Sequence, residues 1–204
     1  MEFTYLNNVI KLPNKELTIL DRLVLDFISR VDIRYVIISG YVAILFGRSR
    51  NTEDVDIFIE DKGLVSFTSF YTKIILGRRY YSINAEDAKD AYELMRGFGS
   101  LRFAEKETFN PNFEIKFAKD ETDFYSLNNP LTVDLGLEPK LKVSPLELEI
   151  PYKLYLGSEK DFADAAHLYT VFKEILDVKR LKVFLNDLNI SKSVKKRVLG
   201  DAYE

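Results

Sequence analysis

The sequence predicts a mixed α/β (α+β) fold, in which a mixed β-sheet with flanking helices is followed by a C-terminal helical lobe. Two observations carry this prediction. Short β-branched or aromatic runs alternate with helical patterns up to residue 143, whereas residues 144–204 show helix signals alone. The chain therefore divides into a core, residues 1–143, and a helical lobe, residues 144–204.

The core is predicted to hold three longer helices and five strands. Asn14 is a candidate N-cap, and apolar residues then recur at three- and four-residue steps to about Ser29. The longer helices are expected over residues 14–29, 61–76 and 84–96. The strands are expected over residues 35–38, 54–59, 101–105, 113–118 and 131–137. The segment DETDFYSLNNP, before the last strand, is interpreted as a turn.

The lobe begins with a strong helix signal at Ser144-Pro145-Leu146-Glu147, which combines an N-cap serine, a first-turn proline and a glutamate three residues on. Pro151 is expected to kink this helix. Further helices are predicted to follow Ser158, Asp177 and Ser191.

Two acids mark the strand DVDIFI. Because side chains alternate along a strand, Asp54 and Asp56 share one face with Phe58. Carboxylates at this spacing, roughly 6 to 7 Å apart, can jointly bind Mg²⁺, which prefers carboxylate oxygens and leaves room for substrate phosphates. Upstream, the Ser39-Gly40 turn before a short helix offers backbone N–H groups and a hydroxyl to phosphate oxygens.

The stretch VIISGYVAILFGRSRNTEDVDIFI resembles the signature of the DNA polymerase β-like nucleotidyltransferases. In that signature a glycine turn and a spacer lead to an Asp-x-Asp strand. The inner Arg50-x-Thr52-x-Asp54-x-Asp56 is typical of bacterial and archaeal members, and serine replaces the first glycine of the turn. The resemblance implies a mixed-sheet nucleotidyltransferase core that binds a nucleoside triphosphate such as ATP at Ser39, Gly40, Arg50 and Thr52.

The resemblance also implies a third carboxylate on a neighbouring strand. Glu114 is the candidate, and Asp134 is the competing choice. Glu114 is preferred because alternating aromatic residues flank it in its strand.

Later residues are similar to motifs of the abortive-infection (AbiEii-like) toxin branch, in which a lysine and an acidic helix start hold the nucleotide. Lys153 and Asp161 match these positions. This similarity implies a toxin-antitoxin component with an antitoxin partner.

The implied reaction moves a nucleoside monophosphate from the triphosphate onto a hydroxyl of a protein, an RNA or a small molecule. Asp54, Asp56 and Glu114 are expected to bind two Mg²⁺ or Mn²⁺ ions as the catalytic metal ligands. Glu114 would accept the hydroxyl proton, while Arg50 and Lys153 would offset phosphate charge.

Composition excludes several other chemistries. The 204 residues include no cysteine and a single histidine, His167, so thiol catalysis, disulfides and multi-histidine metal sites are ruled out. The net charge of -3 gives no global attraction to nucleic acid. With no long apolar segment, we expect a cytoplasmic protein without a membrane partner.

Two other functions stay open at this stage. Serine at the turn and glutamate in place of the commoner aspartate also suit a nucleotide-binding regulatory module that has lost turnover. A plain interaction domain would bind no nucleotide, and Asp54 and Asp56 would then be the charged face of an edge strand.

Overall fold

The computed structural model describes residues 2–200 of the chain. Its strands are β1 (Thr4–Leu6), β2 (Val9–Lys11), β3 (Tyr35–Ile38), β4 (Asp54–Ile59), β5 (Tyr80–Ser82), β6 (Leu101–Glu105), β7 (Asn112–Phe117), β8 (Leu131–Asp134) and β9 (Leu141–Val143). Its helices are α1 (Ile19–Ile28), α2 (Gly40–Leu45), α3 (Leu64–Ile75), α4 (Ala88–Arg96), α5 (Glu121–Asn128), α6 (Leu146–Leu156), α7 (Glu159–Phe172), α8 (Val178–Asp187) and α9 (Lys192–Leu199).

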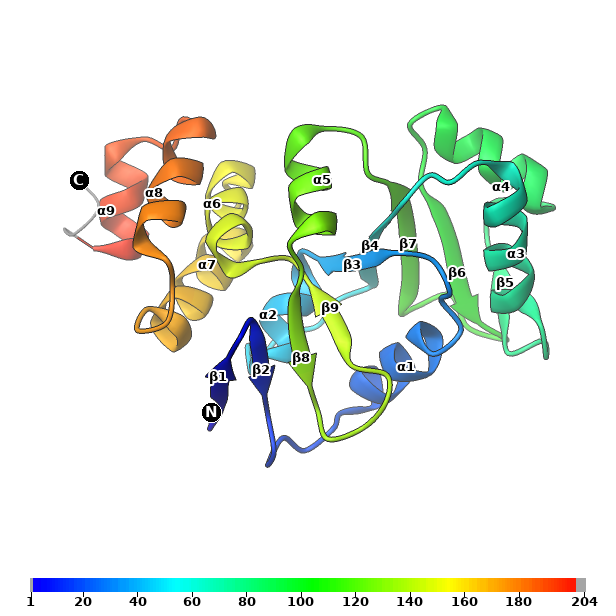
Figure 1. Cartoon of the computed structure of the whole chain (residues 1–204), viewed down its shortest axis with the longest axis horizontal. Helices are drawn as coiled ribbons and strands as arrows, with labels where there is room; N and C mark the ends of the chain where they lie inside the picture. The colour runs from blue at the N-terminus through cyan, green and yellow to red at the C-terminus, as the bar shows by residue number, and fades with distance from the viewer. Residues whose placement is uncertain (1, 201–204) are drawn as a thin grey trace.

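All of these strands join one mixed sheet in the order β1-β2-β8-β9-β3-β4-β7-β6-β5 (Figure 1). Strand β4 is near the middle, antiparallel to β3 and parallel to β7. The register sets Ile38 and Glu114 on either side of Asp56. The predicted mixed α/β class is confirmed.

One face of the central strands carries the main apolar core. The side chains of Val55, Ile57 and Ile59 are almost completely buried on this face. Helix α1 packs there through Phe27, whose ring stacks on Phe113 of β7 at a centroid distance of 3.8 Å. Because each buried aromatic ring removes a large apolar area from water, this layer fixes the position of β4 and β7.

The opposite face of β3 and β4 is only partly covered. Helix α5 packs over its far end, where Val36, Ala118 and Leu127 form a small apolar cluster with Ile38 and Phe58 at its margin. The acidic end of β4 extends beyond this cluster, so its carboxylates are only partly buried. A charged strip thus lies beside an apolar one on the same face.

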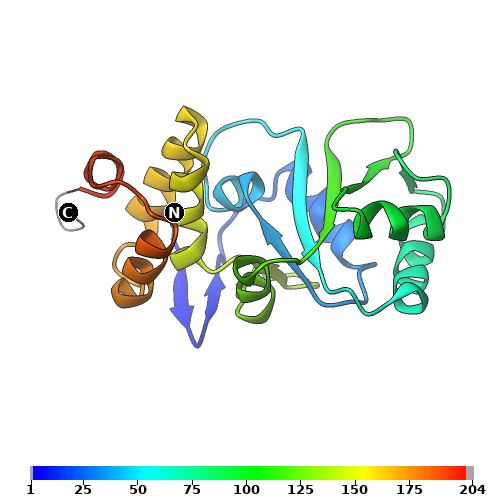
Figure 2. The ribbon, with the colours of Figure 1, turned by 90° about the horizontal axis from the view of Figure 1, so that it is seen from above.

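The helices α6 to α9 gather at one end of the molecule, and α3 and α4 lie at the other (Figures 1 and 2). The main core continues from the sheet into α6, α7 and α8. Phe46, just after α2, meets Phe172 of α7 edge-on with ring centroids 4.7 Å apart. The division into residues 1–143 and 144–204 remains a prediction, and the two parts share this apolar core.

Helix α1 begins later than predicted. Its N-cap is Thr18, which forms a capping box with Asp21, whereas Asn14 donates a side-chain hydrogen bond to Glu2. The capping box satisfies two backbone N–H groups at once, and the helix begins where this arrangement is available.

The segment interpreted as a turn contains helix α5 instead. Asp120 accepts a hydrogen bond from the backbone N–H of Asp123 and caps the helix. The error arises because asparagine, serine and aspartate favour both turns and helix caps. The short strands β1, β2, β5 and β9 were also absent from the prediction.

Several predicted boundaries of the helical lobe are confirmed. Ser158, Asp177 and Ser191 each cap the following helix through the side chain. Helix α6 begins one residue after Pro145 and continues through Pro151, while the Ser144 hydroxyl contacts Ser126 rather than capping the helix.

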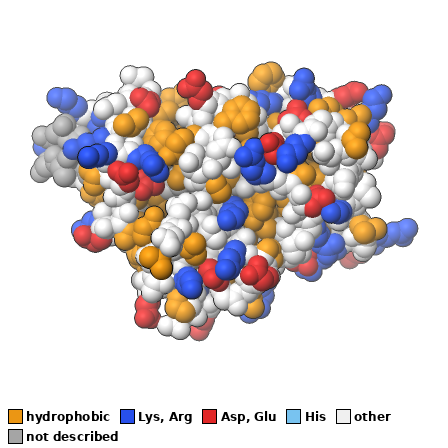
Figure 3. Space-filling view, in the orientation of Figure 1, with side chains coloured by type: hydrophobic (Ala, Val, Ile, Leu, Met, Phe, Trp, Pro, Cys, Tyr) orange, Lys and Arg blue, Asp and Glu red, His pale blue; other side chains and the backbone are white. Residues whose placement is uncertain are grey.

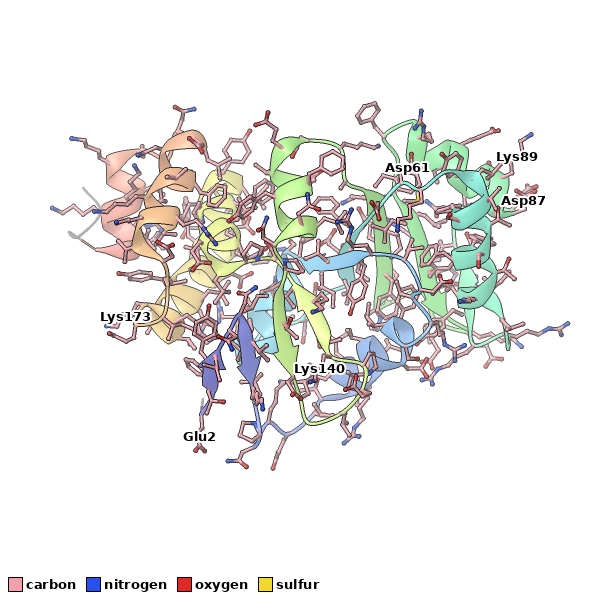
Figure 4. All side chains as sticks on the ribbon, in the orientation of Figure 1. Glu2, Asp61, Asp87, Lys89, Lys140 and Lys173 are labelled. Carbon is pink, nitrogen blue, oxygen red and sulfur yellow. The ribbon has the colours of Figure 1, made fainter. Side chains whose placement is uncertain are left out.

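The surface drawn in Figure 3 carries acidic and basic side chains in alternation rather than one large area of a single sign. Of the charged side chains labelled in Figure 4, Glu2, Lys89 and Lys173 lie at the periphery and point outward. Across residues 2–200 we find no helix with the length and apolar character needed to cross a bilayer.

Candidate functional site

Three carboxylates lie on the partly open face of β4 and β7. Asp54 and Asp56 are two residues apart on β4, and Glu114 is the direct cross-strand neighbour of Asp56 in the parallel ladder. Since paired residues on adjacent strands project to the same side of a sheet, Glu114 joins the two aspartates. The side chains of Asp56 and Glu114 are 17% and 10% exposed, which leaves both within reach of a bound molecule.

Two cations that the sequence analysis did not single out hold these acids. The Lys116 Nζ lies 2.6 Å from Glu114 Oε1 and 3.3 Å from Asp56 Oδ1. On the other side of the glutamate, Arg102 of β6 donates from Nε and Nη2 to Glu114 Oε2, at 3.2 and 2.9 Å. The alternation of Asn112, Glu114 and Lys116 along β7 is the sequence signal that could have revealed Lys116, because residues at i and i+2 share a face.

The electrostatic environment shifts the pKa values of Asp56 and Glu114 in opposite directions. Burial raises the pKa of Asp56, the charges of Asp54 and Glu114 add to this, and Lys116 opposes them. Burial alone would also raise the pKa of Glu114, but Lys116 and Arg102 together hold that pKa below its ordinary value. Although burial disfavours the charged ammonium, Glu114 and Asp56 raise the pKa of Lys116. Lys116 is therefore a cation at neutral pH.

The three carboxylates have the oxygen chemistry that Mg²⁺ or Mn²⁺ prefers. As the side chains lie, however, they do not fit a metal: within the described residues, no three acidic or histidine groups are arranged to hold an ion. The Lys116 ammonium lies in contact with two of the three acids instead. An ion could use this set only after Lys116 moves.

The Ser39-Gly40 turn lies beside the acids. Ile38 pairs with Asp56, so the next two residues pass alongside the start of β4. Ser39 has a positive φ of 64°, which is unusual for a residue with a side chain. Gly40 makes room for Arg50, because a Cβ at residue 40 would lie 2.3 Å from the Arg50 Nη2. The glycine thus serves internal packing as well as the turn.

A buried ionic cluster lies behind the turn. Arg50 donates from Nε and Nη2 to the two carboxylate oxygens of Asp164 at 3.1 and 2.9 Å, and Lys153 Nζ lies 3.1 Å from Asp164 Oδ2. Asp164 is fully buried, and the Lys153 side chain is 1% exposed. Asp161 is bonded to the Ser158 hydroxyl and lies 4.0 Å from Lys153. We call Arg50, Lys153, Asp161, Asp164 and Glu149 the buried ionic cluster.

Glu149 connects this cluster to the turn. Burial raises the pKa of Glu149, while Lys153 and hydrogen bonds from the Ser39 backbone and the Ser144 side chain oppose the shift. The carboxylate oxygen Oε1 of Glu149 is buried with no hydrogen-bond partner in the described structure. Of the predicted nucleotide-binding residues, Arg50 and Lys153 thus share the buried acceptor Asp164, and Lys153 also lies near Asp161. Arg50 keeps 12% of its side chain exposed and lines the cleft described next.

Thr52 links the acids to a large cleft. Its hydroxyl donates to the Asp54 backbone oxygen at 2.9 Å and lies 3.3 Å from Asp54 Oδ1. The same residue lines a cleft of about 580 Å³ between α1, the loop before β4 and the segment before β7. Apolar residues such as Leu23 and Ile44 line it together with the exposed Arg22. A second cavity of about 30 Å³, between β3, β4, α5 and α6, has room for a water molecule.

Two other residues lie away from the acids. Asp134 is on β8, which β9 and β3 separate from β4, and it pairs with Lys140 at 3.5 Å. Glu114 is thus the acid that the fold brings to Asp56. His167 bonds the backbone oxygen of Phe46 through Nε2 at 3.0 Å, which is a packing role.

Comparisons with known proteins add one finding about the fold. The structure is similar to the crystal structure of an antigenic nucleotidyltransferase-like protein from Paracoccidioides brasiliensis, with a TM-score of 0.51, 16% sequence identity, and coverage of 87% of this chain and 88% of that chain. This protein has a nucleotidyltransferase-like fold. No protein-family model matches the sequence, and the curated proteins yield no match.

Proposed function

We propose that this protein is a nucleotidyltransferase that moves a nucleoside monophosphate from a nucleoside triphosphate onto an acceptor hydroxyl. The observation that carries the proposal is the register that sets Glu114 beside Asp56, with Asp54 on the same face and the Ser39-Gly40 turn alongside. The similarity of fold to a nucleotidyltransferase-like protein supports it. Fold alone does not determine activity, whereas the three acids supply groups that can take part in the chemistry.

In the proposed reaction, the acceptor oxygen forms a bond to the α-phosphorus while the bond from that phosphorus to the β-bridging oxygen breaks. Pyrophosphate leaves with the bonding electrons. We assign the proton acceptor to Asp56 in place of Glu114, which was expected from the sequence, because the pKa of Asp56 is raised, whereas Lys116 and Arg102 lower that of Glu114. Glu114 and Lys116 would then keep Asp56 in place.

The substrates are assigned to two regions. The triphosphate is proposed to lie over Asp54 and Asp56, with the Ser39 hydroxyl and Lys116 near its oxygens. The cleft beside Thr52 is proposed to take the acceptor, because Thr52 joins it to Asp54 and it combines apolar walls with the Arg22 guanidinium. The Mg²⁺ or Mn²⁺ expected from the sequence is part of the proposal; when bound it would neutralise phosphate charge.

The buried ionic cluster is proposed to support the site from behind. Arg50, Lys153 and Asp161 would fix the Ser39-Gly40 turn through Gly40 and Glu149, in place of direct contact with the nucleotide.

An assay with labelled ATP, CTP, GTP and UTP tests the function. The wild-type protein is expected to release pyrophosphate in the presence of Mg²⁺ or Mn²⁺, whereas Asp56→Asn should not. Asp134→Asn is a matched control, because it removes the competing acid three strands away. Equal release by wild type and Asp56→Asn would contradict the proposal.

A second candidate function is nucleotide binding without turnover. The contact of Lys116 with two of the three acids favours it, since an ammonium in this place can bind phosphate without a metal. Saturable nucleotide binding with no pyrophosphate release would select this candidate.

The toxin branch suggested by the sequence is a further proposal. Expression in a bacterial host is expected to arrest growth, and Asp56→Asn should relieve the arrest if transfer causes it. An antitoxin partner would suppress the wild-type effect when co-expressed.

A further inference from the structure

Lys116 has an unusual place among the charged residues of the site. Its ammonium contacts Glu114 at 2.6 Å and Asp56 at 3.3 Å, and its side chain is 37% exposed. Both acids are more buried than the lysine that joins them. The cation thus caps the acidic pair from the solvent side and has a path outward.

We propose that Lys116 is a resident counter-ion that alternates between two partners. Without substrate it neutralises Asp56 and Glu114, and a divalent cation can bind these acids only by displacing it. With a nucleoside triphosphate present, the ammonium moves to the phosphate oxygens, and the two acids lose their counter-ion. The movement of Lys116 to the triphosphate rests on the proposed function. The competition between Lys116 and a metal ion for the acids does not depend on that function.

The competition follows from charge. An ammonium and a divalent cation both bind carboxylate oxygens, and the two cations repel each other at short distance. Because Lys116 is tethered to β7, it meets the acids at a high effective concentration, so a dissolved ion binds at a disadvantage. The free protein should therefore bind metal weakly.

The fold offers Lys116 a place to go. Asp123 of α5 lies close enough for the Lys116 charge to oppose the rise in its pKa that burial causes. A lysine stem is long and flexible, and its ammonium can rotate between acceptors at little cost. Movement toward α5 would bring the ammonium nearer to the Asp123 carboxylate as it leaves Asp56 and Glu114.

Arg102 holds Glu114 alone, whereas Lys116 contacts both Glu114 and Asp56. Arg102 donates to Glu114 Oε2, whereas Lys116 contacts Oε1, and among the described residues no hydrogen bond or ion pair joins Arg102 to Asp56. When Lys116 leaves, Arg102 still orients the glutamate. The two cations on Glu114 are therefore not equivalent.

The test uses the full chain and measures two affinities in separate arms. In the first, Mn²⁺ alone is titrated against wild type, Lys116→Met and Lys116→Arg, and free Mn²⁺ is followed by electron paramagnetic resonance. Lys116→Met should bind Mn²⁺ on the order of tenfold more tightly than wild type. Lys116→Arg keeps the charge and should stay near wild type.

In the second arm, a fluorescent α,β-methylene ATP analogue is titrated in buffer with EDTA. Here Lys116→Met should bind about tenfold more weakly than wild type, because the triphosphate loses its ammonium partner. Tighter Mn²⁺ binding together with weaker nucleotide binding in one variant is what an alternating counter-ion predicts. Partial unfolding would instead weaken the binding of both ligands.

The outcomes separate the two claims. Equal Mn²⁺ affinity in wild type and Lys116→Met, or no Mn²⁺ binding by either, would overturn the inference. Absence of nucleotide binding by every variant, together with tighter Mn²⁺ binding by Lys116→Met, would refute the proposed function and the second partner while upholding the competition with metal.

Discussion

Arg50 donates two hydrogen bonds to Asp164, from a loop of the sheet region to helix α7, 114 residues further along the chain. The Arg50 guanidinium thus binds both carboxylate oxygens of Asp164. This bidentate arrangement fixes the relative orientation of the two side chains and also pairs their charges. It anchors the loop that leads to Asp54 and Asp56. The position of the acidic strand thus depends on a helix of the lobe.

Breaking this pair is expected to destabilise the protein strongly. Asp164→Ala leaves Arg50 and Lys153 without their common acceptor inside the protein. We expect a loss of roughly 3 to 5 kcal/mol in the free energy of unfolding, measured by urea denaturation. As a control, Asp187→Ala at the end of α8 should change the unfolding free energy by less than about 0.5 kcal/mol. A similar small loss for Asp164→Ala would show that the cluster is not structural.

Gly40→Ala is expected to act through Arg50. The new Cβ would lie 2.3 Å from the Arg50 Nη2 and push the guanidinium away from Asp164. We expect a cost of roughly 1 to 3 kcal/mol in the free energy of unfolding. In an Arg50→Ala background the same substitution should cost much less, and a double-mutant cycle measures the difference. Additive effects would mean that the glycine is needed for another reason.

Ser39→Gly is expected to stabilise the protein. Ser39 has a φ of 64° and a ψ of -134°, a region that suits glycine, and such strain costs on the order of 1 kcal/mol or more. The gain should appear as a higher midpoint in thermal unfolding. Ser39→Ala keeps the strain and should give no gain. If Ser39→Gly is stabilising but lowers nucleotide affinity, the hydroxyl contributes to binding.

Tyr35 is expected to make stability depend on pH in alkaline solution. Burial raises the pKa of Tyr35 to about 12 in the folded protein. Since the unfolded value is near 10, the folded state holds the proton more tightly, and stability is complete below about pH 10 and falls as the pH rises toward 12. Tyr35→Phe should flatten this decline in urea denaturation between about pH 10 and 12. An unchanged decline would assign it to other groups.

The local pattern of the acidic strand could be read from the sequence because it depends on alternation alone. Asp54 and Asp56 share a face in any strand, and the structure places them so. The choice of Glu114 over Asp134 agrees with the register of β7. That register could not be derived from β7 itself, since it pairs β7 with β4, a strand more than 50 residues earlier in the chain.

The roles of Arg50, Lys153 and Lys116 could not be predicted from local sequence patterns. Arg50 belongs to the Arg50-x-Thr52-x-Asp54-x-Asp56 motif, and Lys153 matches a later motif of the toxin branch, so both look like phosphate ligands in sequence. Only the fold brings Asp164 between them, and it buries Lys153 while Arg50 stays 12% exposed. Alternation along β7 places Lys116 on the face of Glu114, but a lysine near the end of a strand has many surface roles, so its sequence position alone does not assign it to the site. Its contact with Asp56 joins residues 60 positions apart.

The most direct test of the central claim is pyrophosphate release by wild type and by Asp54→Asn, Asp56→Asn and Glu114→Gln, each shown to be folded by circular dichroism. Wild type is expected to release pyrophosphate from at least one of the four triphosphates with Mn²⁺ present, and each variant should lose at least about 100-fold in rate, as expected when a positioned acid is removed. Turnover that survives in all three variants would contradict the assignment of the acids.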